Sequence, residues 1–357
     1  MIKIASNSMK LVIAKDTDQY FGSQLRDLDF PVEIFPIDPV DASNPTWDSI
    51  PDCDALFLSY QFLFAIRDNQ ELFQPLLNLC KRMQFIQTGY AGMDDPFCQA
   101  MLKESKAVID NASSIHAIHI NHYVMSQMLR WNKRIDQHIE LQNEKNWSPM
   151  GGDGELTNKT LLILGYGGIG REVAKLGKAF GMNVIGIRRK PEECEFADEV
   201  LTMDRLEEFL PVTDFLVMAL PNARDTDDVI NKKVLQKLNN SAMLINVGRG
   251  NSINEQDLAN ALNSGELAAA ALDTTKIEPL DTASDLWTAR NCFISAHDSA
   301  HSLLGLPRSF ELFLENVKNF LRHDNGKTMR VVKSILEELN YDVFFSCLLY
   351  TSDAADE

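Results

Sequence analysis

Short, mostly apolar runs recur through the first part of the chain, at residues 11–14, 32–35, 55–58, 85–87 and 107–109. Each run is too short for a helix and is typical of a strand buried on both faces of a parallel sheet. Amphipathic stretches between some of the runs, such as residues 72–83 and 97–106, predict helices. Strands and helices in alternation predict an α/β domain with a parallel sheet.

The same alternation resumes near residue 160. Strand patterns cover residues 161–164, 183–187, 199–201, 215–220, 242–246, 268–272 and 292–295. Helical patterns lie at residues 204–210, 232–238 and 254–264, and Gly265 is expected to end the last of them. These elements predict a second, doubly wound parallel-sheet domain of the Rossmann type.

Two longer helical patterns flank the second domain. Residues 114–132 predict one helix, with Ser113 or Ser114 as its N-cap. Residues 303–322 have a strong apolar face and are expected to carry the chain back to the first domain. Residues 142–158 contain a proline and several glycines, and predict a loop.

A glycine fingerprint joins the strand at 161–164 to the helix that follows. Gly165, Gly167 and Gly170 have the G-x-G-x-x-G spacing, which permits a tight turn, close approach of a pyrophosphate and close packing of helix on strand. The unpaired amides at the start of that helix can bind a phosphate. The sequence therefore predicts dinucleotide binding by residues Gly165, Tyr166, Gly167, Gly168, Ile169 and Gly170.

The residues after the second strand bear on which dinucleotide binds. An acid at that strand end binds the ribose 2′-hydroxyl in NAD enzymes, but here the position is Arg188, followed by Arg189 and Lys190. Guanidinium groups attract a 2′-phosphate, so NADP is the preferred prediction and NAD the alternative. The alternative is that the three cations form a solvated turn after the strand.

Three strand ends carry residues suited to catalysis. Arg249 could bind a carboxylate and polarise a carbonyl oxygen. His297, with a carboxylate partner such as Glu278, suits acid–base chemistry near neutral pH. Taken singly, Arg249 could be a surface cation and His297 a capped strand end, but together, after a dinucleotide fingerprint, they indicate an enzyme.

Composition narrows the remaining choices. A net charge of −17 argues against a nucleic-acid partner, and no apolar run approaches membrane-span length. Six cysteines without CxxC pairing, and no signal-peptide pattern, predict free thiols in the cytoplasm. His116, His119 and His122 could bind a metal, but cleft-lining or surface positions are favoured, and no metal site is predicted.

The chain resembles the D-isomer-specific 2-hydroxyacid dehydrogenase family, including its glyoxylate and hydroxypyruvate reductases. The matching pieces are LGYGGIG, ALPNARDT, MLINVGRG, ALDTTKIEP and FISAHDSA. The resemblance implies that Arg249 binds the substrate carboxylate and keto oxygen, while Glu278 orients His297 as proton donor. Asp273 would hold the nicotinamide carboxamide. The loop QTGYAGMD at 87–94 would bind substrate through Tyr90, Ala91 and Gly92. Further cofactor contacts are implied for Leu220, Pro221, Thr226, Val247 and Gly248.

The resemblance also implies an architecture. The substrate domain would be flavodoxin-like and would consist of residues 1–113 and 300–346. The nucleotide domain, residues 114–299, would be inserted between these two parts. Two copies of the chain would form a homodimer through the nucleotide domain. The substrate would be a small 2-oxo or 2-hydroxy acid. Departures at Asn121-His122, Thr274-Thr275, Ala296 and Asp298 touch the cleft, so the particular acid stays open. A corepressor-like NAD(P) sensor and a dehydrogenase of another small anion stay as alternatives.

The last stretch of the chain differs from the rest. Residues 347–357, CLLYTSDAADE, resemble one reading frame of a common transposase-type sequencing adapter. We therefore expect them to be a non-native tail outside the fold, against the alternative of an ordinary acidic tail.

Overall fold

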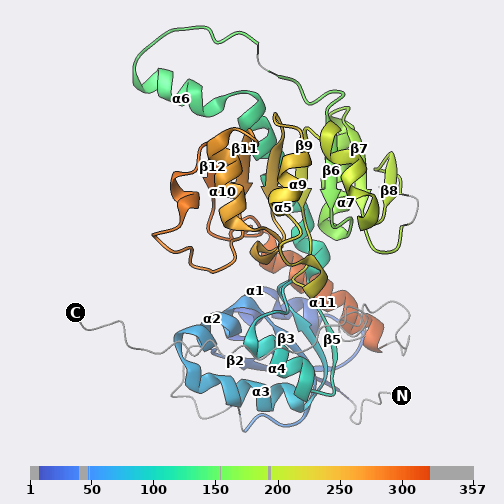
Figure 1. The fold of residues 1–357 in the computed structure, drawn as a ribbon. Helices are drawn as coiled ribbons and strands as arrows, with labels where there is room; N and C mark the ends of the chain where they lie inside the picture. Colours follow the sequence, from blue (N-terminus) through green and yellow to red (C-terminus); the bar gives the residue numbers. More distant parts are fainter. Residues whose placement is uncertain (1–7, 40–46, 48, 153, 192–193, 322–357) are drawn as a thin grey trace, which may run out of the picture.

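The protein is built from two parallel-sheet α/β domains (Figure 1). A computed structural model describes residues 8–39, 47, 49–152, 154–191 and 194–321. No helix in those ranges is long and apolar enough to cross a membrane. The cysteines in those ranges are free thiols.

The first domain has a five-stranded sheet in the order β2-β1-β3-β4-β5, which is the flavodoxin order. Its strands are β1 (Met9–Ala14), β2 (Val32–Ile37), β3 (Cys53–Leu58), β4 (Met83–Thr88) and β5 (Val108–Asp110). Its helices are α1 (Lys15–Arg26), α2 (Tyr60–Asp68), η1 (Gln70–Leu72), α3 (Phe73–Lys81), α4 (Pro96–Glu104) and α11 (Gly305–Leu321). All five predicted strands are present, and the two predicted helices end slightly earlier than expected.

Helix α11 completes the first domain from the far end of the chain. Phe310 and Phe313 are fully buried in a cluster that includes Phe57 and Phe85 of the sheet. Asn316 donates from Nδ2 to Asp110 Oδ2 at 2.9 Å, and also bonds Gln87. The predicted return of the chain is therefore confirmed, although the helix begins at Gly305 and its predicted end at residue 322 lies outside the described residues.

The second domain has a seven-stranded sheet in the order β12-β11-β10-β9-β6-β7-β8, a Rossmann arrangement with one added strand. Its strands are β6 (Thr160–Leu164), β7 (Asn183–Ile187), β8 (Glu199–Leu201), β9 (Phe215–Met218), β10 (Met243–Asn246), β11 (Ala269–Leu272) and β12 (Cys292–Ile294). Its helices are α5 (Ser113–Asn132), α6 (Ile135–Asn143), α7 (Gly168–Ala179), η2 (Met203–Arg205), α8 (Leu206–Phe209), η3 (Leu210–Val212), η4 (Arg224–Thr226), α9 (Lys232–Lys237), η5 (Gly250–Ser252), α10 (Glu255–Ser264) and η6 (Asp285–Thr288).

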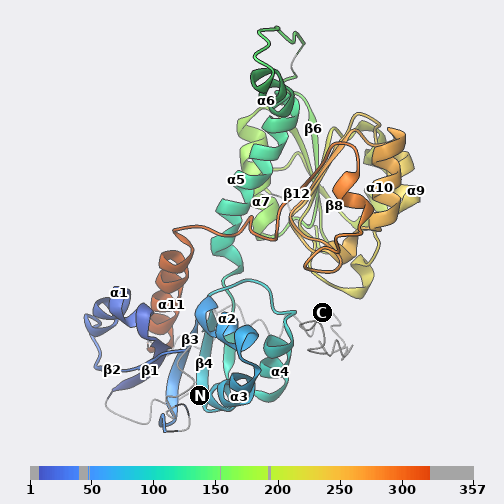
Figure 2. The same ribbon diagram turned by 90° about the vertical axis from the view of Figure 1, so that its left-hand side faces the viewer.

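Helix α5 and the segment after β12 are the two connections between the domains (Figure 2). Ile120, Val124 and Met125 of α5 are buried in the core of the second domain. Asn121, one of the departures from the family pattern, donates from Nδ2 to the carbonyl of Glu172 in α7 at 2.8 Å. This residue therefore fastens the connecting helix to the nucleotide domain.

Three local predictions are wrong. The residue before α5 is Ala112, with no side-chain cap, so neither Ser113 nor Ser114 is the N-cap. Residues 142–143 belong to α6, which was not predicted because none of its residues is buried and only Ile135 and Ile139 form an apolar pair on it. Residues 204–210 form two 3₁₀ turns around the short helix α8 rather than one helix.

Candidate active site

The predicted site residues gather at the carboxyl ends of the strands of the seven-stranded sheet. The loops after β6, β9, β10 and β11 carry the fingerprint, Leu220, Arg249 and Asp273 respectively, and His297 follows β12. The carboxyl edge of an open parallel sheet is where ligands bind, next to the point where the strand order reverses. In this sheet the reversal lies between β6 and β9.

The turn after β6 has the geometry that a dinucleotide requires. Gly165 has a φ of +96°, which side chains other than glycine rarely adopt. A Cβ on Gly167 would meet nothing within 4 Å, whereas one on Gly170 would lie 2.5 Å from the carbonyl oxygen of Gly165. Gly167 therefore leaves open space in front of the first amides of α7, where a pyrophosphate fits, and Gly170 lets the helix pack on the turn.

Tyr166 takes part in this turn through its backbone. Its side chain is only 1 % exposed, and its ring lies against Gly186 of β7, where a Cβ would clash. Its hydroxyl donates to Cys194 Sγ at 3.3 Å.

The three predicted cations follow β7. The backbone amide of Arg188 donates to the carbonyl of Leu201. The side chain of Arg188 is partly exposed, and the side chains of Arg189 and Lys190 are exposed.

The loops after β9 and β10 touch each other beside the fingerprint. A Cβ on Gly248 would lie 2.7 Å from the carbonyl oxygen of Leu220. Thr226 Oγ1 donates to the carbonyls of Pro221 and Ala223, at 2.9 and 2.7 Å, and so closes the loop after β9. Val247 is buried beneath them. The structure thus brings these predicted cofactor residues together.

His297 and Glu278 form a hydrogen-bonded pair. His297 Nδ1 lies 2.8 Å from Glu278 Oε2, and each side chain is about two-fifths exposed. The hydrogen bond that Glu278 accepts from His297 raises the pKa of His297 above that of a free imidazole, against the opposing effect of burial. Burial would raise the pKa of Glu278, but His297 outweighs it, so that pKa is lowered. Both shifts favour the ion pair of a protonated imidazole and an ionised carboxylate.

Asp273 fixes the backbone around His297. Its carbonyl accepts from the amide of His297 at 2.9 Å, and its carboxylate accepts from the amides of Asp298 and Ser299 at 3.1 Å. Ser295 Oγ, itself 2.8 Å from Tyr123 Oη, donates to the same carboxylate at 2.6 Å. These bonds hold His297 in a left-handed conformation with φ of 53°. This structural role of Asp273, and the parts of Ser295 and Tyr123, were missed by the sequence analysis.

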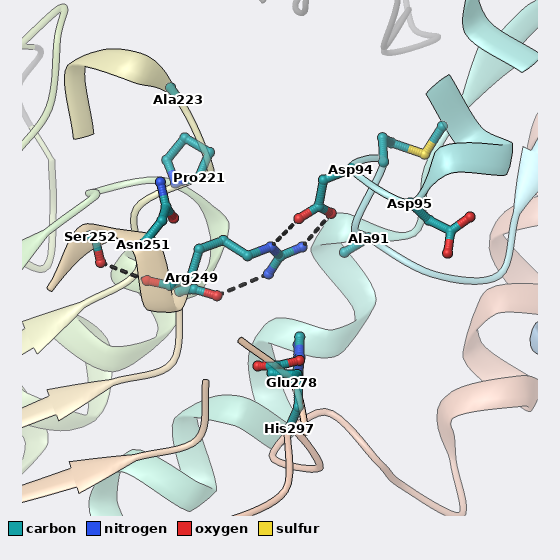
Figure 3. Close-up of polar contacts among 12 residues, drawn as sticks. Ala91, Asp94, Asp95, Pro221, Ala223, Arg249, Asn251, Ser252, Glu278 and His297 are labelled. Atoms are coloured by element: carbon teal, nitrogen blue, oxygen red, sulfur yellow. Dashed lines mark hydrogen bonds and ion pairs between the residues drawn. The ribbon is translucent and has the colours of Figure 1, made fainter. Parts of the chain in front are cut away.

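Arg249 makes a bidentate ion pair across the cleft (Figure 3). Its Nε donates to Asp94 Oδ2 at 2.8 Å and its Nη2 donates to Asp94 Oδ1 at 3.1 Å. Burial would raise the pKa of Asp94, but the charge and hydrogen bonds of Arg249 outweigh it and lower that pKa. Figure 3 shows Glu278 and His297 below Arg249 in the same close-up, and the charge of Arg249 acts on the pKa of both residues. A joint role of the three residues stays a prediction.

The predicted substrate loop follows β4 directly. The Tyr90 side chain is 3 % exposed and sits in the core of the first domain, with its hydroxyl 3.5 Å from Cys98 Sγ. The ring therefore packs away from the loop surface, and a substrate contact by residue 90 stays a prediction for its backbone. Ala91 and Gly92 are partly exposed and face Arg249.

The three histidines of α5 do not converge. His116 is buried, with Nε2 3.3 Å from the carbonyl oxygen of Gly89, and burial lowers its pKa. His122 is exposed and His119 is intermediate. Within the described ranges of the chain, no group of three or more His, Cys, Asp or Glu side chains could hold a metal ion.

A glycine-rich nucleotide-binding turn, with an arginine and a hydrogen-bonded His–Glu pair at the same sheet edge, is typical of the class of NAD(P)-dependent oxidoreductases. More narrowly, the chain belongs to the D-isomer specific 2-hydroxyacid dehydrogenase family, because residues 125–299 match that family's NAD binding domain.

Relatives and solved structures agree with this membership. A glyoxylate/hydroxypyruvate reductase A from Serratia proteamaculans is 34% identical over 181 residues, which span 51% of this chain but only 58% of that reductase. A D-isomer specific 2-hydroxyacid dehydrogenase family protein from Aeromonas salmonicida is 28% identical with a TM-score of 0.73, covering 89% of this chain and 96% of that one. A probable 2-hydroxyacid dehydrogenase from Rhizobium etli, in complex with NADP, HEPES and L(+)-tartaric acid, is 25% identical with a TM-score of 0.67, covering 91% and 98%.

A second family model, that of C-5 cytosine-specific DNA methylases, matches residues 309–353. The described part of this match is the C-terminal portion of α11, which packs against the sheet of the first domain. The match also covers part of the segment that resembles a sequencing adapter. It is too short to assign the chain to the methylase family.

Proposed function

We propose that this protein reduces a small 2-oxo acid, such as glyoxylate or hydroxypyruvate, to the 2-hydroxy acid with a reduced nicotinamide cofactor, and that a chiral product has the D configuration. The observation that carries the proposal is the hydrogen-bonded pair of His297 and Glu278, which shares the cleft with Arg249. Family membership and the reductase relatives support the same reaction class. The chain spans little more than half of the reductase A relative, so the substrate is part of the proposal.

Each residue of the site has a proposed task. The guanidinium of Arg249 and the amides of Ala91 and Gly92 bind the substrate carboxylate, and Arg249 also polarises the keto oxygen. When bound, the reduced nicotinamide supplies a hydride to the keto carbon. His297 gives its proton to the oxygen as negative charge develops there, and Glu278 keeps the imidazole oriented and protonated. Asp273 holds the backbone of His297, and a nicotinamide contact is proposed for it in addition.

We further propose NADP(H) as the preferred cofactor. The fingerprint glycines and the start of α7 would hold the pyrophosphate, as the open space at Gly167 allows. Arg188, with Arg189 beside it, would meet the 2′-phosphate of the adenosine, because the strand end after β7 has no acid to repel it. The Rhizobium etli relative in complex with NADP supports this preference.

The direct test is steady-state consumption of NADPH and NADH with a panel of 2-oxo acids that includes glyoxylate, hydroxypyruvate and pyruvate. We expect turnover with at least one small 2-oxo acid, and loss of that turnover in Arg249→Gln. Asp298→Asn is a matched control, since it removes a charge next to His297 but keeps the backbone amide that Asp273 binds. Cofactor binding without turnover of any member would favour a sensor and contradict the proposed enzyme.

We also propose that the protein forms a homodimer through the nucleotide domain. Helix α6 projects from that domain (Figure 2) and has no buried residue. Ile135 and Ile139, one helical turn apart, are 43% and 50% exposed, and Trp147 is 99% exposed. Apolar side chains on a projecting element indicate a surface that a second copy covers.

A further inference from the structure

Arg249 forms an ion pair with Asp94 of the first domain, a residue that has no task in the proposed reaction. Asp94 accepts from Nε and Nη2 of the guanidinium, at 2.8 and 3.1 Å, in a fork-to-fork geometry. The third guanidinium nitrogen, Nη1, donates to the carbonyl of Gly248 at 2.9 Å. Every nitrogen of the group therefore has a partner, and the plane of the guanidinium is fixed.

Asp94 sits on a loop that is itself held in place. The next residue, Asp95, caps α4 by accepting from the amide of Phe97 at 2.9 Å. Asn111 Nδ2 donates to the carbonyl of Ala91 at 2.8 Å, and Gln99 Nε2 donates to that of Met93. The carboxylate of Asp94 is thus presented to Arg249 from a well-anchored backbone.

The same loop lies directly against the guanidinium. A Cβ on Gly92 would lie 2.6 Å from Arg249 Nη2 and 3.0 Å from Asp94 Oδ1. A side chain at residue 92 would therefore require the end of the Arg249 side chain to shift. The two halves of the proposed carboxylate site, amides from the first domain and arginine from the second, therefore meet at the point where Asp94 joins them.

We propose that Asp94 is a positioning residue: its carboxylate fixes the Arg249 guanidinium against the loop at Ala91 and Gly92, so that arginine and amides bind the same substrate carboxylate. The inference rests on the proposed reduction of 2-oxo acids. Asp94 itself does not touch the reacting atoms. Its effect is on Arg249, whose long side chain would otherwise lose conformational entropy each time it bound substrate.

The test compares Asp94→Asn with the native protein, using the most active 2-oxo acid of the panel. Asparagine keeps the shape of the side chain but removes the charge that binds both nitrogens. We expect kcat/KM to fall roughly 100-fold, the effect of misplacing a reacting group by about 1 Å. The dissociation constant of NADPH and the melting temperature should stay unchanged. Asp95→Asn is the matched control, since asparagine caps a helix as well as aspartate.

A second comparison tests whether Asp94 acts on kcat/KM through Arg249. In an Arg249→Lys background the bidentate pair cannot form, so adding Asp94→Asn should change kcat/KM by less than about threefold. An equal loss in both backgrounds would show that Asp94 does not act through Arg249 and would overturn the inference. An unchanged or increased kcat/KM in Asp94→Asn alone would also overturn it. Absence of turnover in the native protein would instead remove the proposed function on which the inference rests.

Discussion

Replacement of His297 separates its proposed chemistry from its backbone geometry. His297 has a φ of 53°, in the left-handed region that asparagine tolerates and alanine does not. Both His297→Asn and His297→Ala remove the proton donor, so both should lower kcat for reduction by roughly 10²–10⁴-fold, the usual contribution of general acid catalysis. Cofactor affinity should hardly change, because the imidazole is bonded to Glu278 and not to the fingerprint.

The two variants should differ in stability. A left-handed conformation costs a residue with a Cβ about 1–2 kcal/mol, a cost that asparagine largely avoids. For a domain of this size each kcal/mol shifts the melting temperature by about 2–4 °C, so the alanine variant should melt several degrees below the asparagine variant. Stopped assays of cofactor consumption and thermal scans measure both effects. A kcat within about threefold of native for His297→Asn would refute the assignment of the proton donor.

Four further outcomes follow from the same residues. The kcat/KM for reduction should be highest at low pH and fall as pH rises through the raised pKa of His297, since the protonated form is the donor. Glu278→Gln should move that fall in kcat/KM to lower pH. The native protein should prefer NADPH over NADH roughly 10- to 150-fold, measured as the ratio of the two kcat/KM values, and Arg188→Asp should weaken or reverse that preference. Equal kcat/KM values for NADPH and NADH in the native protein would exclude the preference. Deleting residues 347–357 should leave melting temperature and activity unchanged, and a loss of either would argue against a non-native tail. Sedimentation equilibrium should find a dimer that Ile139→Glu weakens, and a native monomer would contradict the proposed assembly.

The sequence predicted the strands well because many of them are buried along most of their length. The runs in β3, β6, β9, β10 and β11 are almost entirely buried, so their apolar character shows directly in the residues. Helix α6 could not be found in the same way, because burial imposes no periodicity on a helix without buried residues. The packing of α11 on the first domain could be predicted only from the apolar face of this helix and from the resemblance to a family.

The hydrogen-bonded pair could be predicted because Glu278 and His297 lie in segments with a recognisable pattern. Asp94 lies in the quoted substrate loop, but its partner is 155 positions away, and no local pattern reports such a contact. The direction of the Tyr90 ring could not be predicted for the same reason, because it is decided by packing against α2 and α4. Asp94 could have been found by asking which acidic residue pairs with Arg249.

The central claim is that the cleft between the two domains converts a 2-oxo acid into a D-2-hydroxy acid. The most direct measurement is the product itself: hydroxypyruvate or glyoxylate-type substrates incubated with NADPH, followed by chiral chromatography for those that give a chiral product. The account predicts a D-2-hydroxy acid formed in equal amount to the cofactor oxidised, and none in His297→Asn. An L-2-hydroxy acid, or cofactor oxidation without any hydroxy acid, would contradict it.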